Sequence, residues 1–273
     1  QTCALPISSH LPYPTMAEAH PDGKHLVVAC ATGFRVFEIH PGGLVLVRDN
    51  VLGVCPDSFA ISPDGRWIVA ALPVARGTNS IAGVYRCRVR GIEIERTDEI
   101  QVREGLPAFA SPFSLRFAPD GNRVLVPNGG GMSAKGRFDD ILSIDMSADP
   151  PVATEAVLQV ADGIESVAFH PSGRFAVVGC LDDTPGDTLS GGSHLAVIDL
   201  TTKPMRLLYH LPLEPFPEGI AFTPDGTQLF VQLTTVNRII VFDVRGMMLD
   251  RSPFVLRVGQ GPSSMALSRV SHR

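Results

Sequence analysis

The stretch GIAFTPDGTQLFVQLTTVNRIIVFDV, residues 219–244, decides the fold of this chain. Its first run, residues 219–222, alternates in hydrophobicity and ends in the turn Pro224-Asp225-Gly226, in which Pro presets φ, Asp bonds its own backbone and Gly supplies positive φ. Two runs of β-branched and aliphatic residues follow, at 228–233 and 238–244. The stretch therefore predicts a β-hairpin that continues into a third strand.

The same template recurs along the whole sequence. Its turn prolines are Pro21, Pro63, Pro119, Pro171 and Pro224. A strand opens seven residues before each proline, at Pro14, Pro56, Pro112, Ile164 and Pro217, and a further copy opens at Pro262. Each copy has room for four strands, and repeats of about 40 to 55 residues with four strands are typical of β-propeller blades. The sequence thus predicts an all-β propeller of four-stranded antiparallel blades, with about five complete blades and the start of a sixth.

These repeats resemble the YVTN type, which is found in YncE-like proteins of bacteria and in the seven-bladed lactonase family. The resemblance covers essentially residues 12 to 268, and the Trp-Asp dipeptide of WD40 repeats is absent, because Trp67 is the sole tryptophan. Both families have seven blades. We therefore expect a fragment of a seven-bladed propeller, either an open arc or a strained ring with an unpaired blade edge.

The chain is expected to form one domain. Residues 1–7, QTCALPI, resemble the translated end of a sequencing adapter and are set aside as an artefact. Residues 8–273 would then be a single propeller domain. We expect its blades near residues 12–55, 56–110, 111–161, 162–214 and 215–260, with a partial blade at 261–273.

Net charge, apolar run length and cysteine spacing restrict the kinds of molecule that the protein could bind. The net charge of −5 and the pI of about 5.9 lack the basic field that nucleic acid or an anionic membrane surface requires. No apolar run has the length of a membrane span. No CxxC pair occurs, which argues against a zinc site. We also expect no other metal and no cofactor. We expect a monomer when full length, and a periplasmic location is slightly favoured over a cytoplasmic one.

Alignment of the copies brings several polar residues to one position, just inside the mouth of the first strand. These residues are Thr15, Asp57, Phe113, Glu165, Glu218 and Ser263. Because first strands line the central channel of a propeller, Asp57, Glu165 and Glu218 would face a common entrance. There they could bind a cation or act as a catalytic acid–base pair. The alternative is that each carboxylate caps its own loop or pairs with an arginine.

Two charges stand three residues further along, where four copies have alanine. They are Glu18 and Arg116. We expect Arg116 to bind an anionic group of a ligand, because its planar fork suits carboxylate or phosphate. The alternative is an arginine exposed in the channel or paired with Glu18.

Two long loops supply further ligand-binding candidates. Asn128 lies in one loop, and Asp182 and Asp183 lie in the other. Neither loop has a calcium-binding pattern, and both could simply be solvated. His20 and His170 directly precede the turn proline and are interpreted as turn residues.

Two functions remain open. The first is binding of a small molecule or a protein at the loop face of the propeller, without a catalytic motif of its own. The second is implied by the lactonase resemblance: hydrolysis of a sugar lactone such as 6-phosphogluconolactone, with channel carboxylates activating water and Arg116 holding the substrate anion. The fold does not decide between them.

Overall fold

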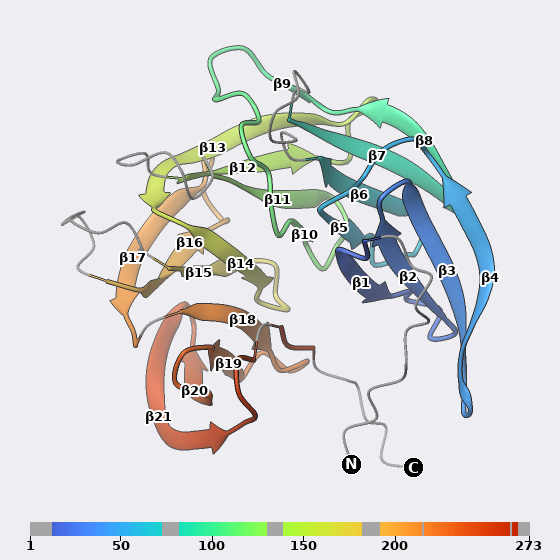
Figure 1. Ribbon diagram of the computed structural model, residues 1–273. Coiled ribbons are helices and arrows are strands. Elements are labelled where there is room, and N and C mark those ends of the chain that lie inside the picture. Colours follow the sequence, from blue (N-terminus) through green and yellow to red (C-terminus); the bar gives the residue numbers. More distant parts are fainter. Residues whose placement is uncertain are drawn as a thin grey trace.

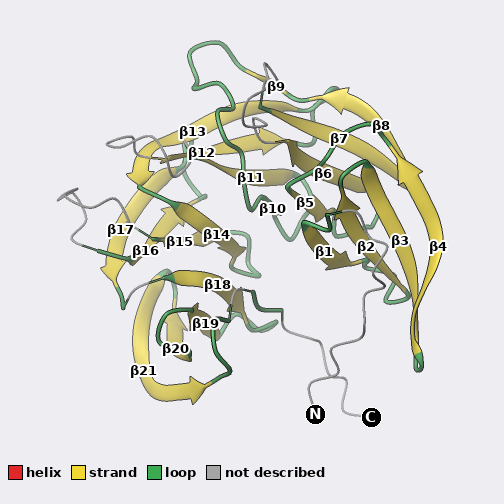
Figure 2. Cartoon of the chain, viewed as in Figure 1, coloured by secondary structure: helices red, strands yellow, loops and turns green. Residues whose placement is uncertain are grey.

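The structure, a computed structural model, describes residues 13–72, 82–129, 139–181, 192–214, 216–262 and 264–266. Every regular element in these ranges is a β-strand, and the strands form five sheets (Figure 2). The predicted all-β class and the four-stranded antiparallel blades are confirmed. Residues 1–7, Asp182, Asp183 and Ser263 lie outside the described residues.

Each sheet is built from consecutive strands of one repeat. The first contains β1 (Met16–Ala19), β2 (His25–Cys30), β3 (Gly33–His40) and β4 (Gly43–Val51). The second contains β5 (Ser58–Ile61), β6 (Trp67–Leu72), β7 (Gly83–Arg90) and β8 (Glu93–Glu99). The third contains β10 (Arg116–Phe117), β11 (Arg123–Asn128), β12 (Asp139–Asp145) and β13 (Val152–Ala161), with β9 (Gln101–Val102) at its outer edge. The fourth contains β14 (Ile164–Phe169), β15 (Phe175–Cys180), β16 (His194–Asp199) and β17 (Arg206–Pro212). The fifth contains β18 (Pro217–Phe222), β19 (Gln228–Leu233), β20 (Arg238–Arg245) and β21 (Met248–Arg257).

Strand β9 is the one strand whose sheet differs from the expected blade range. It falls within residues 56–110, the range assigned to blade 2, but it pairs in parallel with β13 of blade 3. It covers part of the outer edge of β13, an edge that stays unpaired on the outer strands of the other four blades in the described residues. A two-residue strand with no hairpin partner of its own carries no signal in the repeat template.

The five sheets form a propeller, in which the first strand of each blade is innermost (Figure 1). Neighbouring blades touch through these strands in chain order, β1 with β5, β5 with β10, β10 with β14 and β14 with β18. Blades 1 and 5 stand apart in Figure 1, so the ring is open between them. The structure thus contains the five complete blades that the repeats predict.

Four hydrophobic cores hold the arc together, one between each pair of neighbouring blades. Strand residues alternate between the two faces of a sheet, so a central blade buries both. In blade 4, for example, Ala176 and Val178 pack toward blade 3, whereas Val177 and Phe175 pack toward blade 5. Every residue of β15 and β16 is consequently buried.

The two end blades lack such a neighbour on one side. Among the described residues, most exposed large hydrophobic side chains lie in β3 and β4 of blade 1 or in β21 of blade 5, namely Ile39, Val45, Leu46, Val51, Met248, Phe254, Val255 and Leu256. Phe254, Val255 and Leu256 are consecutive, so both faces of β21 are uncovered there. The end faces are therefore apolar surfaces without a covering sheet.

The segment after β21 turns back toward the channel. Thr234 Oγ1, which follows β19, donates to the carbonyl oxygen of Pro262 at 2.6 Å. Pro262 opens the sixth copy in the sequence. The start of the sixth copy therefore lies against blade 5.

Candidate ligand-binding channel

A cavity of about 750 Å³ lies on the propeller axis, where the five innermost strands converge. It is lined by residues of β1, by residues at the start of β5, β10, β14 and β18, and by the segment 264–266. The position that the alignment singled out contributes Thr15, Asp57, Phe113, Glu165 and Glu218 to its wall. Residues up to about 200 positions apart in sequence thus meet in one cavity because each repeat places its first strand at the centre.

Glu18 and Arg116 line the same cavity. They come from blades 1 and 3, at positions where the other described copies have alanine. Among the described residues no ion pair joins them, so the pairing considered from the sequence is not formed. Both charged groups therefore face the cavity without neutralising each other directly.

The surroundings of Glu18 follow from the alternation along β1. Met16 and Glu18 share the face toward blade 2, and there they meet the inner edge of β5, which has no strand beside it. Glu18 Oε1 accepts a hydrogen bond from Ile61 N at 3.4 Å. Oε2 is enclosed and has no hydrogen-bond partner among the described residues. A buried carboxylate oxygen without a partner is costly.

Burial also changes the acidity of Glu18. Desolvation raises the pKa of this carboxyl group to about 7, although the charge of Arg116 and the bond from Ile61 N act in the opposite direction. A carboxyl group with a pKa near neutrality can hold or release a proton under ordinary conditions. Burial raises the pKa of Asp57 as well.

Arg116 begins the very short strand β10. Ser114, two residues earlier, has a φ of 48°, so the chain bends before β10 and only two residues pair with β11. Arg116 Nη1 donates to the carbonyl oxygen of Leu115 at 2.8 Å, which anchors one corner of the guanidinium group. No carboxylate in the described part of the chain pairs with it. The other N–H groups can serve an acceptor within the cavity.

One lining residue was missed from the sequence. Ser58 follows Asp57, and its hydroxyl is buried with no hydrogen-bond partner in the described ranges. The signal was present, because Ser114, Ser166 and Ser264 occupy the same position in other copies. Ser166 has a backbone role, since its hydroxyl donates to Pro217 O at 3.4 Å. Ser58 has no such acceptor, and it adds a second unpartnered polar atom to that of Glu18.

Asn128 lies away from this cavity and holds a loop. Its Oδ1 accepts from Ala110 N at 2.8 Å, and its Nδ2 donates to Ala108 O at 2.9 Å. The side chain is 5% exposed, so both hydrogen bonds are protected from water. The structure thus places Asn128 as an anchor of the segment that leads into β10.

Two further searches cover only the described residues. They contain no cluster of three or more His, Cys, Asp or Glu side chains suited to a metal ion. They also include no helix long and apolar enough to traverse a lipid bilayer.

Comparison with known families gives one match in the sequence. Residues 155–184 match the family described as WD domain, G-beta repeat. This stretch runs from the outer strand of blade 3 through β15 of blade 4, so it covers less than one four-stranded repeat. No curated protein matches the chain.

Solved structures share the fold at low sequence identity. A protein of unknown function from Desulfotomaculum acetoxidans has a TM-score of 0.68 and is 15% identical, over 88% of this chain and 69% of that one. A putative 6-phosphogluconolactonase from Bacteroides fragilis has a TM-score of 0.65 and is 16% identical, over 92% and 72% of the two chains. A periplasmic gluconolactonase from Pseudomonas aeruginosa has a TM-score of 0.65 and is 16% identical, over 86% and 68%. These likenesses show the β-propeller fold.

Proposed function

We propose that the protein binds a small polar molecule in the central channel, with Arg116 as the group that receives an acidic part of the ligand. The observation that carries this proposal is the lining of one 750 Å³ cavity, in which the carboxyl group of Glu18 and the guanidinium group of Arg116 form no ion pair with each other, and in which Arg116 bonds only the carbonyl oxygen of Leu115 among the described residues. Cavities of about 300–1,000 Å³ with a few convergent polar groups are typical of small-molecule sites. The resemblance to YncE-like proteins implies a binding function, and we propose the central channel as its site.

A thermal-shift screen with polar metabolites tests the proposal, followed by calorimetric titration of each hit. Arg116→Ala should weaken the binding of a hit by about tenfold or more, because a charge-assisted hydrogen bond is lost. Arg174→Ala is the matched control, because Arg174 lies outside the lining of the cavity. Hits that bind both variants equally well would contradict a channel site at Arg116.

Lactone hydrolysis is the second candidate, and one observation favours it. Glu18, with a pKa raised to about 7, lies in the channel with Arg116, and Asp57, Glu165 and Glu218 line the same cavity. A carboxylate there would activate water, and Arg116 would hold an anionic substituent of the lactone. Two of the proteins that share the fold are a putative 6-phosphogluconolactonase and a gluconolactonase. Release of acid from gluconolactone and 6-phosphogluconolactone above the spontaneous rate, abolished in Glu18→Gln, would establish this activity.

We also propose that the five blades belong to a ring with further blades, as the resemblance to seven-bladed propellers implies. The position of Pro262 against blade 5 and the uncovered apolar faces of blades 1 and 5 support this proposal. Determining the gene sequence on both sides of the known codons tests it. Further copies of the repeat would support a larger ring, and their absence would contradict it.

A further inference from the structure

The charges around the channel restrict the kind of ligand that it accepts. Among the described residues, the carboxyl groups of Glu18, Asp57, Glu165 and Glu218 line the cavity together with the guanidinium group of Arg116. With a half-protonated Glu18 this lining is net negative. Coulomb repulsion therefore disfavours a ligand that carries only negative charge, and above all a dianion such as a phosphate ester.

A ligand with only a positive charge does not fit either. It would meet the carboxylates, but it would leave Arg116 without an acceptor beyond the carbonyl oxygen of Leu115. It would also place its own charge in the field of the guanidinium group. A neutral ligand would leave the carboxylate of Glu18 with no cationic partner. The charged groups of the described lining are therefore matched best by a ligand with both charges.

We propose that the channel ligand is a zwitterion, whose cationic nitrogen pairs with the carboxylate of Glu18 and whose anionic group accepts from Arg116, since both residues line the cavity. This inference rests on the proposed binding function and narrows it to one ligand class. Ammonium and carboxylate groups joined by a short aliphatic chain are the simplest members of that class.

Glu18 and Arg116 would bind opposite ends of the ligand. Glu18 must be ionised to hold the cationic nitrogen, so at neutral pH binding should release a fraction of a proton from its carboxyl group. Arg116 stays charged throughout and fixes the other end of the ligand. The spacing of the two charges in the ligand should therefore matter as much as their presence.

The probes are the linear ω-amino acids from glycine to 6-aminohexanoate, each compared with the alkylamine and the carboxylate of the same length. Calorimetric titration at pH 7 in two buffers of different ionisation enthalpy measures affinity and proton release together. One amino acid should bind about tenfold or more tighter than both of its matched analogues. Its binding should release protons, and Glu18→Gln should abolish this release.

Arg116→Ala should remove the advantage of the amino acid over the matched amine while leaving the affinity for the amine unchanged or higher. Circular dichroism and urea unfolding of both variants show whether they fold. If carboxylates or phosphorylated sugars bind through Arg116 more tightly than every amino acid, the zwitterion is wrong while the binding function stands. If the amino acids bind no better than their analogues and the screen yields no Arg116-dependent ligand, both proposals fail.

Discussion

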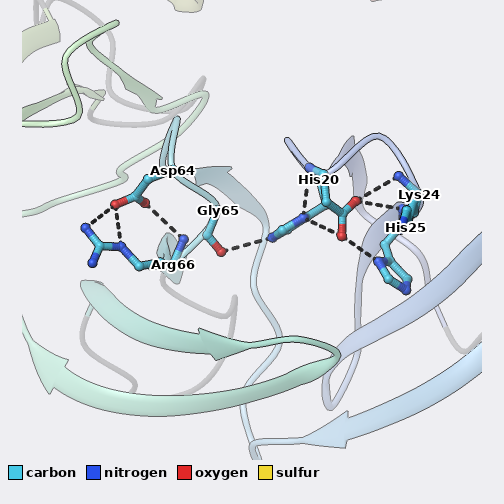
Figure 3. A network of polar contacts seen from close by, with 7 residues as sticks. His20, Lys24, His25, Asp64, Gly65 and Arg66 are labelled. Atoms are coloured by element: carbon cyan, nitrogen blue, oxygen red, sulfur yellow. Dashed lines mark hydrogen bonds and ion pairs between the residues drawn. The ribbon is translucent and has the colours of Figure 1, made fainter.

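The Nε2 atom of His20 donates to the carbonyl oxygen of Gly65 at 2.9 Å, and this bond links the Pro-Asp-Gly turn of blade 1 to that of blade 2 (Figure 3). The same relationship joins His170 to Gly226 at 3.1 Å, between blades 4 and 5. The sequence identified both histidines as turn residues. Their contact with the next blade is a second role, because propeller geometry brings successive turns side by side.

A methyl group at Gly65 should loosen this junction. The φ of Gly65 is +72°, and an added Cβ would lie 2.6 Å from the His20 ring. Gly23 has a φ of +70° with nothing within 4 Å, so Gly23→Ala measures the backbone cost alone. We expect Gly23→Ala to lower the free energy of unfolding by about 1 kcal/mol, and Gly65→Ala by about 1–2 kcal/mol more. Urea unfolding measures both.

The double variant His20→Ala/Gly65→Ala isolates the contact. Removing the ring makes room for the new methyl group, so the extra loss caused by Gly65→Ala should disappear in the His20→Ala background. Losses that simply add would show that the His20 ring and Gly65 are not coupled.

The stability of the unliganded protein should depend on pH through Glu18. Its pKa is raised from 4.5 to about 7 in the folded state, so the folded protein binds the proton more tightly than the unfolded chain. The contribution of protonated Glu18 to the free energy of unfolding is fully present below about pH 4.5. It is lost as the pH rises through 7, and the loss amounts to up to about 3 kcal/mol. Glutamine does not titrate, so the free energy of unfolding of Glu18→Gln should not show this decrease. The stability of the wild type relative to the variant should therefore fall as the pH rises. Urea midpoints from about pH 5 to pH 8 test this, and parallel curves would contradict it.

Asn128 should prove structural. Asn128→Ala removes both anchors of the segment at Ala108 and Ala110, so we expect faster tryptic cleavage at Arg103 and a loss of about 1–3 kcal/mol in stability. Binding in the channel should change little, because Asn128 does not line the cavity. A large loss of ligand affinity with unchanged proteolysis would assign it to the binding site instead.

The end blades should cause self-association. Leu46 and Leu256 are 49% and 48% exposed on blades 1 and 5, whereas Leu158, 58% exposed, lies on the central blade 3. Leu46→Ser and Leu256→Ser should reduce light scattering at increasing protein concentration, and Leu158→Ser should not. Equal effects of the three substitutions would argue against the end faces as the sites of association.

Much of the fold could be predicted from the sequence, because the recurring turn prolines show how the copies of the repeat align with one another. The turn prolines indicate where each first strand begins, and first strands line the channel of a propeller. The sequence alignment therefore predicts that Asp57, Glu165, Glu218, Glu18 and Arg116 lie in the channel. The sequence could not show that Glu18 and Arg116 remain unpaired, since that depends on side-chain directions across two blades. Nor could it show the parallel pairing of β9, which depends on an exposed strand edge.

A crystal structure with the tightest ligand of the screen tests the central claim most directly. We predict ligand density on the propeller axis, with an acidic group within hydrogen-bond distance of Arg116 and a cationic group beside the carboxylate of Glu18. Density in a groove between blades or on the outer strands, with the channel occupied by water alone, would contradict the account.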